Sequence, residues 1–376
     1  MEKYQIVVCD HIHEAGLEML KNDDQIDYVF AADVDKTELL DVIKTADVAI
    51  TRSSTDVDEK FIAAAKNLKA IVRAGVGVDN VDIEGCSKEG IIVMNVPTAN
   101  TIAAVELTMT HMLSCMRMFP YSHDHLKNQR IWKREKWYGH ELKGKKLGVI
   151  GFGNIGSRVA IRAKAFEMDI IAYDPYINAS KVTDLGMEYT ENFDDILACD
   201  IITIHTPKNQ ETLNMIDKEE IEKMKDGVVL VNCARGGIVD EEDLQEAMAS
   251  GKVAGAALDV FASEPPGECR LMEQDRLICT PHLGASTREA QTNVAVAVAR
   301  QIIDYLINGT VVNAVNVPSV AGDLLKKIGP YMAVGDRMGC LQAQLADGPV
   351  KSVTIEYTGD FKGMDMAPVS TAILKG

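Results

Sequence analysis

The sequence predicts an α/β protein built from doubly wound parallel sheets, and two observations carry this prediction. Short apolar segments of strand type alternate with helix-like segments from the N-terminus onward, which is the βαβ rhythm of a parallel sheet. Near the middle of the chain, one apolar strand runs directly into a glycine-rich turn and a helix. At 376 residues the chain is long for a single core, so we expect two or three domains.

The first segments set this rhythm. A strand at Gln5–Cys9 is followed by a helix at His13–Lys21, and Val48–Thr51 and Ala70–Arg73 are further strands. A proline-containing turn then breaks the pattern, and one long helix is expected at Thr98–Met118. The start of the chain is therefore an α/β domain of its own.

A Gly-x-Gly-x-x-Gly motif follows the strand Lys146–Ile150. Its glycines are Gly151, Gly153 and Gly156. The first permits a tight turn, the second lets the backbone approach a diphosphate, and the third lets helix and strand pack closely. The free N–H groups and the dipole at the start of the following helix favour an anion. The motif therefore predicts a dinucleotide site.

An acidic residue at the end of the next strand indicates which dinucleotide binds. Asp174 follows the apolar strand Asp169–Tyr173. Its carboxylate can accept hydrogen bonds from the ribose hydroxyls of the adenosine, and its charge would repel a 2′-phosphate. The sequence thus favours NAD over NADP as the cofactor.

The second half of the chain continues the alternation. Further strands are expected at Asp200–His205, Val228–Cys233, Ala254–Asp259 and Leu277–Thr280. A long helix at Ala285–Asn308 can return to the first domain. Beyond about residue 318 a different unit begins, with a helix expected at Asp323–Ala346 and a strand at Val350–Tyr357.

Composition argues against several classes of function. The formal net charge of −17 disfavours nucleic acid or an anionic membrane as a partner. Eight scattered cysteines without a Cys-x-x-Cys pair indicate reduced, buried thiols, and hence a cytoplasmic protein. The pairs His11/His13 and His123/His125 stand two residues apart, which does not place them on one helix face. No cysteine or acidic cluster completes a ligand set, so we expect exposed histidines and no metal.

Three residues of complementary chemistry follow strands in the second half of the chain. Arg235, Glu264 and His282 each stand just beyond an apolar strand, and strand carboxyl ends meet in one crevice of a doubly wound sheet. A guanidinium can clamp a carboxylate, an imidazole can take a proton, and a carboxylate can orient that imidazole. Beside a nicotinamide, the set suits hydride transfer from a 2-hydroxy acid. Each residue alone is weak evidence, because a single strand-end histidine is more often structural.

Longer motifs surround these residues. They are residues 232–240 (NCARGGIVD), 256–261 (AALDVF) with the Glu-Pro-Pro at 264–266, 281–287 (PHLGAST), 52–55 (RSST) and 73–82 (RAGVGVDNVD). Together they resemble the signatures of the D-isomer-specific 2-hydroxyacid dehydrogenases and, within that family, the D-3-phosphoglycerate dehydrogenases. The resemblance covers roughly residues 4–317.

The resemblance implies a role for each member of the set. His282 would be the acid–base, Glu264 its partner and Arg235 the anchor of the substrate carboxylate. Besides the three glycines and Asp174, the implied cofactor contacts are Asn154, Ile155, His205, Thr206, Pro207, Cys233, Ala234, Asp259, Gly284 and Ala285. Asp259 would meet the nicotinamide amide. A nucleophilic Cys233 is the alternative, although no paired base accompanies it in the local pattern.

The resemblance also implies a substrate site. Its residues would be Arg52, Arg73, Gly75, Val76 and Arg134. Val76 stands where threonine is common in the family, so one hydroxyl near the cofactor is missing. Arg134 lies in a basic run, residues 132–137, which resembles the segment that reaches the phosphate pocket of a neighbouring subunit in this family. For Arg73, a purely structural cation at a strand end is the alternative.

Because the glycine motif begins in mid-chain, the nucleotide domain is expected as an insertion. We predict a flavodoxin-like substrate-binding domain from residues 1–97 and 286–317, an inserted Rossmann domain from residues 98–285, and a partial C-terminal α/β segment from residues 318–376. That last segment resembles the opening of the intervening domain in the long enzymes of this type. No serine-sensing regulatory domain of the ACT type follows it, so a natural short form and a truncated product both stay open.

The implied activity is the NAD-dependent oxidation of D-3-phosphoglycerate to 3-phosphohydroxypyruvate, the first step of serine biosynthesis. The basic residues favour a small anionic, phosphorylated substrate. A related alternative is the reduction of glyoxylate, hydroxypyruvate or another short 2-oxo acid. An alternative of another class is an NAD(H)-sensing, corepressor-like interaction protein, but a sensor needs no acid–base pair. A homodimer or homotetramer is expected, with the Thr98–Met118 helix and the segment near Trp132 against a second copy.

Overall fold

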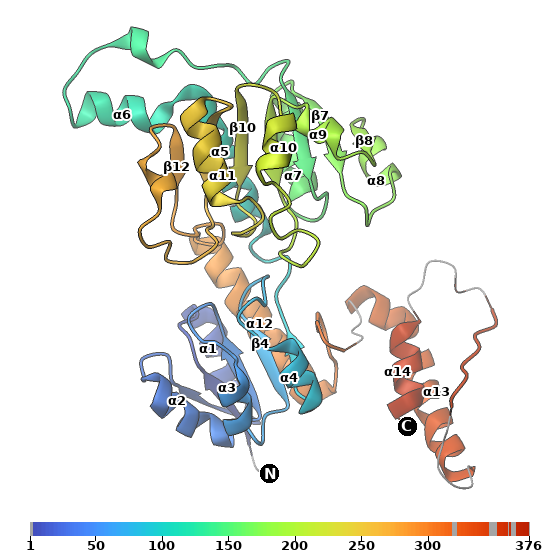
Figure 1. Cartoon of the computed structure of the whole chain (residues 1–376). Helices are drawn as coiled ribbons and strands as arrows, with labels where there is room; N and C mark the ends of the chain where they lie inside the picture. The colour runs from blue at the N-terminus through green and yellow to red at the C-terminus, as the bar shows by residue number, and fades with distance from the viewer. Residues whose placement is uncertain (1–2, 318–321, 346–351, 360, 362–365, 376) are drawn as a thin grey trace. The chain divides into compact units, whose positions relative to one another are not determined.

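The chain folds into two compact units (Figure 1). The structure, a computed structural model, describes residues 3–317, 322–345, 352–359, 361 and 366–375. Unit 1 combines Met1–Pro97 with Thr292–Gly376, and unit 2 is Thr98–Gln291. Unit 2 is therefore inserted between two segments of unit 1.

Unit 1 contains a five-stranded parallel sheet. Its elements are β1 (Tyr4–Val8), α1 (Glu14–Lys21), β2 (Ile26–Phe30), α2 (Lys36–Val42), the 3₁₀ turn η1 (Ile43–Thr45), β3 (Val48–Thr51), α3 (Glu59–Ala64), β4 (Ala70–Arg73), α4 (Ile83–Lys88), β5 (Ile92–Met94) and most of α12 (Arg288–Asn308). The strand order is β2-β1-β3-β4-β5, and all pairs are parallel. This is the flavodoxin-like order, with its switch point between β1 and β3.

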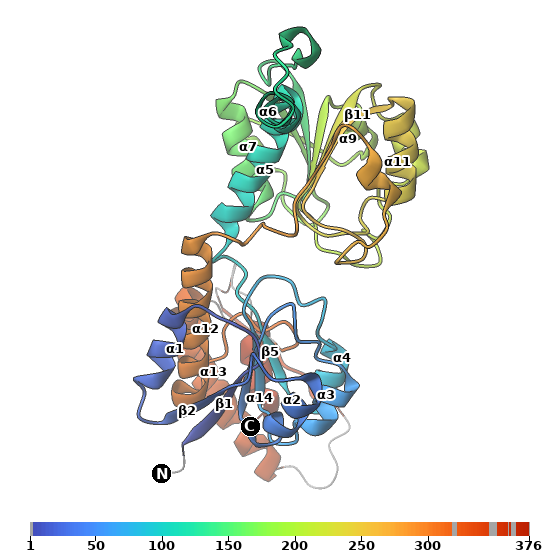
Figure 2. The same cartoon turned by 90° about the vertical axis from the view of Figure 1, so that its left-hand side faces the viewer.

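Helices cover both faces of this sheet, with α1 and α12 on one side and α2, α3 and α4 on the other (Figure 2). Such burial explains why β3 and β4 read as nearly continuous apolar runs. The contact between α1 and α12 requires glycine, since a Cβ on Gly16 would lie 2.6 Å from the carbonyl oxygen of Ala295. The returning helix is thus part of the core of unit 1.

Unit 2 contains a seven-stranded parallel sheet. Its elements are α5 (Thr101–Arg117), α6 (Phe119–Lys127), η2 (Arg134–Trp137), β6 (Lys146–Ile150), α7 (Gly156–Ala165), β7 (Asp169–Tyr173), α8 (Ser180–Thr183), β8 (Glu188–Thr190), α9 (Asp194–Leu197), β9 (Ile201–Ile204), α10 (Lys218–Lys223), β10 (Val228–Asn232), α11 (Glu241–Ser250), β11 (Val253–Leu258), η3 (Arg270–Glu273) and β12 (Leu277–Cys279). The order is β12-β11-β10-β9-β6-β7-β8. The switch point, where ligands bind in doubly wound sheets, lies between β6 and β9.

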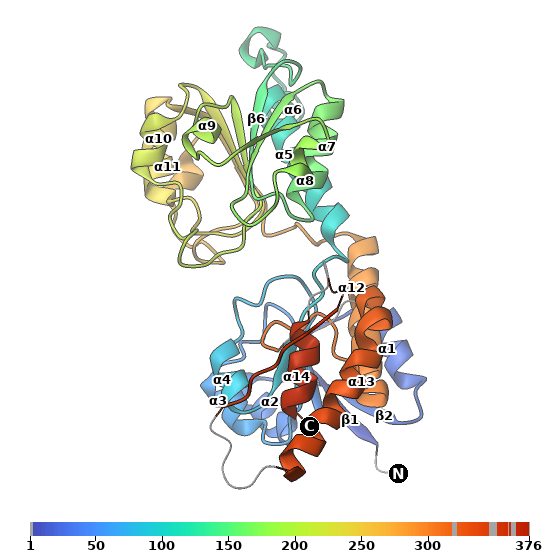
Figure 3. The same cartoon turned by 90° about the vertical axis from the view of Figure 1, so that its right-hand side faces the viewer.

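Helices cover both faces of this sheet (Figure 3), and an apolar core lies beneath each layer. One lies between the sheet and α9, α10 and α11 and includes Ile196, Ile221 and Leu244. The other lies beneath α5 and α7 and includes Met112 and Val159. Alternate residues of β6 point into the two cores, which holds the carboxyl end of this strand at a fixed place.

A long excursion leaves unit 2 between α5 and β6. Met118 adopts a left-handed backbone (φ 52°) that separates α5 from α6. The segment from Phe119 to His140, here called the arm, includes α6 and η2 and projects from the unit (Figure 1). Trp132 and Tyr138 in it are 77% and 78% exposed, so this arm carries apolar side chains that its own unit does not cover.

The C-terminal residues differ from one expectation. Helix α13 (Gly322–Leu345) packs against α14 (Ala367–Lys375), with Ile328 and Val369 buried between them. The strand predicted at Val350–Tyr357 is wrong for residues 352–357, which form no strand, and its first two residues lie outside the described part. The described residues of this segment are thus helical and irregular instead of α/β, because no neighbouring strand in them supplies the hydrogen bonds of a sheet.

Further expectations failed where solvent exposure depends on the tertiary fold. Four of the eight free cysteines are buried, but Cys279 and Cys340 are exposed. His125 is buried against Trp137 in a T-shaped contact and is not the exposed histidine that the spacing suggested.

Among the described residues, no helix has the length and apolar character that a bilayer crossing requires. In the same ranges, no three side chains of metal-binding type gather as a candidate metal centre.

Candidate active site

The glycine-rich turn joins β6 to α7 at the switch point. Gly151 has φ 86°, and a Cβ there would lie 2.7 Å from the carbonyl oxygen of His205. A Cβ on Gly156 would lie 2.0 Å from the carbonyl oxygen of Gly151. A Cβ on Gly153 would meet nothing within 4 Å, and Gly153 and Asn154 are exposed. Two glycines therefore serve the fold, while Gly153 leaves open space beside the start of α7.

Asp174 lies next to this turn. One carboxylate oxygen accepts the N–H of Phe152 at 2.8 Å, and the other accepts the N–H of Tyr176 at 3.0 Å. Each oxygen retains a lone pair for a further donor. The carboxylate is thus held at the glycine turn in a position suited to accept two ribose hydroxyls.

The opposite wall of the switch point comes from the end of β9. The ring of His205 contacts Thr203 at 3.0 Å, and desolvation lowers the pKa of His205 to about 3, so the ring is neutral. Thr206 has a buried hydroxyl for which no described residue offers a partner, and Pro207 follows it. A buried, unsatisfied hydroxyl is costly in a folded chain, so it fits a wall completed by a bound dinucleotide.

Two residues after β10 are fixed by Asn232 at the end of that strand. Its side-chain amide donates to the carbonyl oxygen of Arg235 at 2.9 Å and accepts the N–H of Ala234 at 3.0 Å. The Arg235 guanidinium donates to the carbonyl oxygen of Ala234 at 2.7 Å. Burial raises the pKa of Cys233 to about 12, so its thiol is protonated and unsuited to act as a nucleophile.

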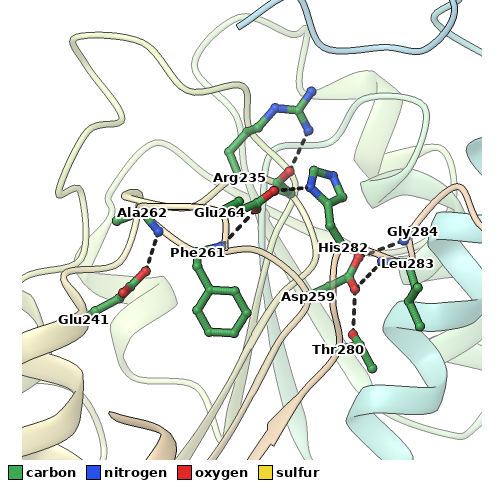
Figure 4. A network of polar contacts seen from close by, with 11 residues as sticks. Arg235, Glu241, Asp259, Phe261, Ala262, Glu264, Thr280, His282, Leu283 and Gly284 are labelled. Atoms are coloured by element: carbon green, nitrogen blue, oxygen red, sulfur yellow. Dashed lines mark hydrogen bonds and ion pairs between the residues drawn. The ribbon is translucent and has the colours of Figure 1, made fainter. Parts of the chain in front are cut away.

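Glu264 and His282 form a direct pair (Figure 4). Oε2 of Glu264 lies 2.7 Å from Nδ1 of His282, and Oε1 accepts the N–H of Phe261 at 3.1 Å. Burial alone would raise the pKa of Glu264, but the hydrogen bonds from His282 and Phe261 and the nearby charges of His282 and Arg235 lower it. The His282 side chain is 48% exposed. In the described ranges no hydrogen bond reaches its Nε2, which is therefore open to a ligand.

A buried network lies directly behind this pair. Asp259 is fully buried, and its carboxylate accepts the Thr280 hydroxyl at 2.6 Å and the N–H groups of Leu283 and Gly284 at 2.6 and 2.8 Å (Figure 4). Nε2 of His111, from the buried face of α5, lies 3.0 Å from the Thr280 hydroxyl. The hydrogen-bond partners of Asp259 given above are residues of the same chain, so its contact with the nicotinamide amide stays a prediction. Sequence reasoning missed His111, although a histidine within an apolar helical run is an informative signal.

The basic residues of unit 1 lie at the carboxyl ends of adjacent strands. Thr51 and Arg73 are in register between β3 and β4, so Arg52 and Arg73 are neighbours. The Arg52 guanidinium donates to the carbonyl oxygen of His11 at 2.9 Å. Arg73 folds over Gly75, where a Cβ would lie 1.7 Å from its Nη1. Within unit 1 the structure thus gathers two guanidinium groups at one edge of the sheet.

Val76 belongs to the same edge. Its carbonyl oxygen accepts the side-chain amide of Asn95 at 2.6 Å, and the N–H of Val96 donates to Gly75 at 2.9 Å. These bonds tie residues 75–76 to the end of β5, so the loop after β4 is held in place beside the two guanidinium groups.

Arg134, the last residue of the predicted substrate site, lies in unit 2 and not in unit 1. It is exposed on η2 in the arm. The end of the arm, at Tyr138 and His140, lines one cavity with Asp200 and Val228, which stand at the amino ends of β9 and β10. Arg235, Glu264 and His282 follow the carboxyl ends of strands. Within one chain, Arg134 therefore lies at the opposite edge of the sheet from these three.

Two parts of the sequence match known family models. Residues 109–284 match the model of the D-isomer specific 2-hydroxyacid dehydrogenase NAD binding domain, and residues 327–376 match the D-3-phosphoglycerate dehydrogenase intervening domain. The chain is 42% identical to the D-3-phosphoglycerate dehydrogenase of Methanocaldococcus jannaschii over 373 residues, 99% of this chain and 71% of that protein. The chain belongs to the D-3-phosphoglycerate dehydrogenase family. Its relatives include the enzymes of that name from Synechocystis (42% identity, 99% of this chain, 67% of that one) and Bacillus subtilis (40%, 99% and 70%).

Solved structures support the same fold. A glyoxylate reductase from Paecilomyes thermophila superimposes with a TM-score of 0.77 and 29% identity, covering 84% of this chain and 99% of that one. The Aquifex aeolicus D-lactate dehydrogenase, solved with NAD and lactic acid, gives a TM-score of 0.72 and 28% identity, covering 84% and 100%. The chain is therefore an NAD-dependent dehydrogenase of the 2-hydroxyacid type with two parallel-sheet domains.

Proposed function

We propose that this dehydrogenase oxidises D-3-phosphoglycerate to 3-phosphohydroxypyruvate with NAD, the first step of serine biosynthesis. The observation that carries the proposal is the Glu264–His282 pair, 2.7 Å apart and next to Arg235, at the carboxyl ends of strands in an NAD-binding domain. The relatives named D-3-phosphoglycerate dehydrogenase extend over 99% of the chain and supply the substrate class.

The chemistry follows from the geometry of the pair. The imidazole of His282 takes the proton of the substrate hydroxyl at Nε2, while Glu264 binds Nδ1 and stabilises the imidazolium that forms. Arg235 binds the substrate carboxylate and orients the carbon that loses hydride. Bound NAD supplies the hydride acceptor.

Unit 2 would hold the cofactor. The open space at Gly153, the aligned carboxylate of Asp174 and the orphaned hydroxyl of Thr206 each fit part of a dinucleotide. The further contacts that we propose are Gly151, Asn154, Ile155, Gly156, His205, Pro207, Cys233, Ala234, Asp259, Gly284 and Ala285. Asp174 favours NAD over NADP because its charge repels a 2′-phosphate.

Unit 1 would bind the substrate. Arg52 and Arg73 offer cations suited to a phosphate and a carboxylate, and the backbone of Gly75 and Val76 lies beside them. We propose that residues 1–97 and 286–317 form this substrate-binding domain and residues 98–285 the NAD-binding domain. The eight free cysteines fit a reducing compartment, so we propose the cytoplasm as its location.

A homodimer would complete the phosphate site. The arm exposes Trp132 and Tyr138, and its Arg134 lies at the far edge of the sheet from His282. Helix α5, by contrast, buries most of its apolar residues within its own unit, so the arm and not α5 offers most of the apolar area for a second copy. We propose that the arm docks on the partner and brings Arg134 to the partner's substrate.

The test is NADH formation from D-3-phosphoglycerate at alkaline pH. We expect turnover by the parent, a loss of about 10²- to 10⁴-fold in kcat for His282→Ala, and a raised KM with little change in kcat for Arg134→Ala. Lys133→Ala, on the neighbouring exposed residue, is the matched control for charge.

Two other outcomes would replace the proposal. NADH consumption with glyoxylate or hydroxypyruvate, and none with the phosphorylated pair, would mean a short-chain 2-oxo acid reductase. NADH binding without turnover of any of these acids would favour an NAD(H)-sensing interaction protein.

A further inference from the structure

The buried network behind His282 has a defined direction. The carboxylate of Asp259 only accepts hydrogen bonds, so the Thr280 hydroxyl donates its single proton to it, at 2.6 Å. The same hydroxyl can then only accept from His111, at 3.0 Å, which requires the proton of a neutral His111 on Nε2. The order of donors is therefore His111, Thr280, Asp259.

The surroundings of His111 agree with this assignment. The side chain is 2% exposed, and burial lowers its pKa despite the opposing effect of Asp259, so the ring is neutral. Its Nδ1 is buried, and no described residue provides it with a partner. In the Nε2–H tautomer this atom is an unused acceptor, and the single N–H of the ring makes its bond. The tautomer that the network requires thus satisfies the only donor of the ring.

The network ends on the backbone that carries His282. Asp259 binds the N–H groups of Leu283 and Gly284 through its carboxylate and the N–H of His282 through its carbonyl oxygen, the last at 2.9 Å. His282 has φ 53°, a left-handed conformation that is strained for a residue with a Cβ. Such a conformation persists only where its surroundings fix it. Here the three bonds from Asp259 fix it, and they aim the His282 ring at Glu264.

We propose that His111 is a positioning residue of the dehydrogenase reaction, acting through Thr280 and Asp259 to hold the 280–284 turn that presents His282 to Glu264 and substrate. The inference rests on the proposed acid–base role of His282 and adds to it a residue on α5 that contacts none of the reacting groups. Because catalysis is sensitive to small misplacements of an acid–base group, the effect is expected in kcat.

The test compares variants that break or keep the donor. His111→Leu removes it, whereas His111→Gln retains an amide N–H at the position of Nε2; Thr280→Val and Thr280→Ser form the second matched pair. We expect His111→Leu and Thr280→Val each to lower kcat by about 10- to 100-fold with a KM within about threefold of the parent. His111→Gln and Thr280→Ser should recover most of kcat. Because both residues act in one chain of bonds, the double variant should lose no more than either single variant.

A control and a second measurement separate positioning from plain stability. Met112→Ala opens a cavity on the same buried helix without touching the network, and should lower Tm while leaving kcat unchanged. Hydrogen exchange of a peptide spanning residues 277–285 should be faster in His111→Leu than in the parent, and should return to the parental rate in His111→Gln.

Two results would overturn the proposal. One is a His111→Leu variant whose Tm falls as it does in Met112→Ala, while its kcat and its hydrogen-exchange rates stay at the parental values. The other is an additive loss in the double variant. If the parent turns over a different 2-hydroxy acid, the proposed substrate fails and the variants are compared on that acid. Hydrogen exchange tests the network without any substrate.

Discussion

At the residue scale, the site depends on side chains whose environments set their protonation. Glu264 is partly buried, yet its bonds to His282 and Phe261 keep it ionised. Cys233 directly follows β10, and burial raises the pKa of its side chain, which stays a protonated thiol. Burial alone therefore does not decide the charge, and the partner within hydrogen-bond distance does.

Glu264→Gln should change the pH dependence of stability. Because the folded state lowers the pKa of Glu264 below its ordinary value of 4.5, the pair stabilises the fold above that value, and this stabilisation is lost as the pH falls through the lowered pKa. We expect the parent to lose Tm more steeply than the variant at acid pH. The same variant should lose about 10²-fold in kcat. Circular dichroism measures Tm at each pH. If Tm falls equally in the parent and the variant as the pH is lowered, the assigned pairing is contradicted.

Asp174→Ala should relax the choice of cofactor. The loss of two hydrogen bonds to a charged acceptor should raise the KM for NAD by about 10- to 100-fold. The ratio of kcat/KM for NAD over NADP should fall, since the repulsion of the 2′-phosphate is gone. Steady-state kinetics with both cofactors measure this. Asp169→Asn, exposed at the other end of β7, is the control and should behave as the parent.

At the element scale, the β6–turn–α7 unit combines a structural and a binding requirement. Gly156 lets α7 begin against Gly151, while Gly153 faces open space. The sequence motif is the same for both glycines, but their neighbours differ. Substitutions at the two positions should therefore have different consequences.

Gly156→Ala should reduce stability, and Gly153→Ala should reduce cofactor affinity. A Cβ 2.0 Å from the Gly151 carbonyl oxygen forces α7 away from β6, and overpacking of this kind should lower Tm by about 5 °C. Gly153→Ala should keep the parental Tm and weaken NADH binding about tenfold, because the methyl group occupies the approach of the diphosphate. Differential scanning calorimetry and NADH fluorescence titration check the pair. Parental affinity in Gly153→Ala would place the diphosphate elsewhere.

At the scale of the whole molecule, the arm exposes large apolar side chains that its own unit does not cover. The arm presents Phe119, Trp132 and Tyr138, which are between 62% and 78% exposed. Large apolar side chains left exposed in one segment are typical of interfaces between subunits. The proposed dimer would cover them.

Trp132→Glu should therefore convert a dimer to a monomer. Burial of a charge in place of an indole disfavours association, and light scattering after gel filtration would show half the parental mass. Phe166→Glu, on an exposed aromatic of unit 2 outside the arm, should leave the mass unchanged. A parental mass for both variants would mean that the arm is not the interface.

The sequence predicted most strands of both sheets because the signals for them are local. The strands Val48–Thr51, Ala70–Arg73, Lys146–Ile150 and Asp169–Tyr173 have the predicted bounds, and five others differ by one residue at one end or both. The strands β2, β5 and β8 were not predicted: β5 and β8 are only three residues long, and β2 carries a charged residue within its apolar run. Each is placed by pairing with the preceding strand, whose paired residues lie 17 to 22 positions earlier in the chain.

The candidate site divides in the same way. The glycine motif, Asp174 and the three strand-end residues could be chosen from sequence, because backbone sterics and parallel topology place such residues together. Their catalytic roles stay predictions until kinetics test them.

The tertiary structure alone decided three features. His111 meets Thr280 across 169 residues, Asp259 is enclosed by the turn after β12, and Arg134 lies at the far edge of the sheet. Each depends on which side chains face each other when distant segments pack, and local periodicity carries no information about that. The sequence by itself thus determined the family, the cofactor type and the order of elements, while packing determined which polar groups hold His282 in place.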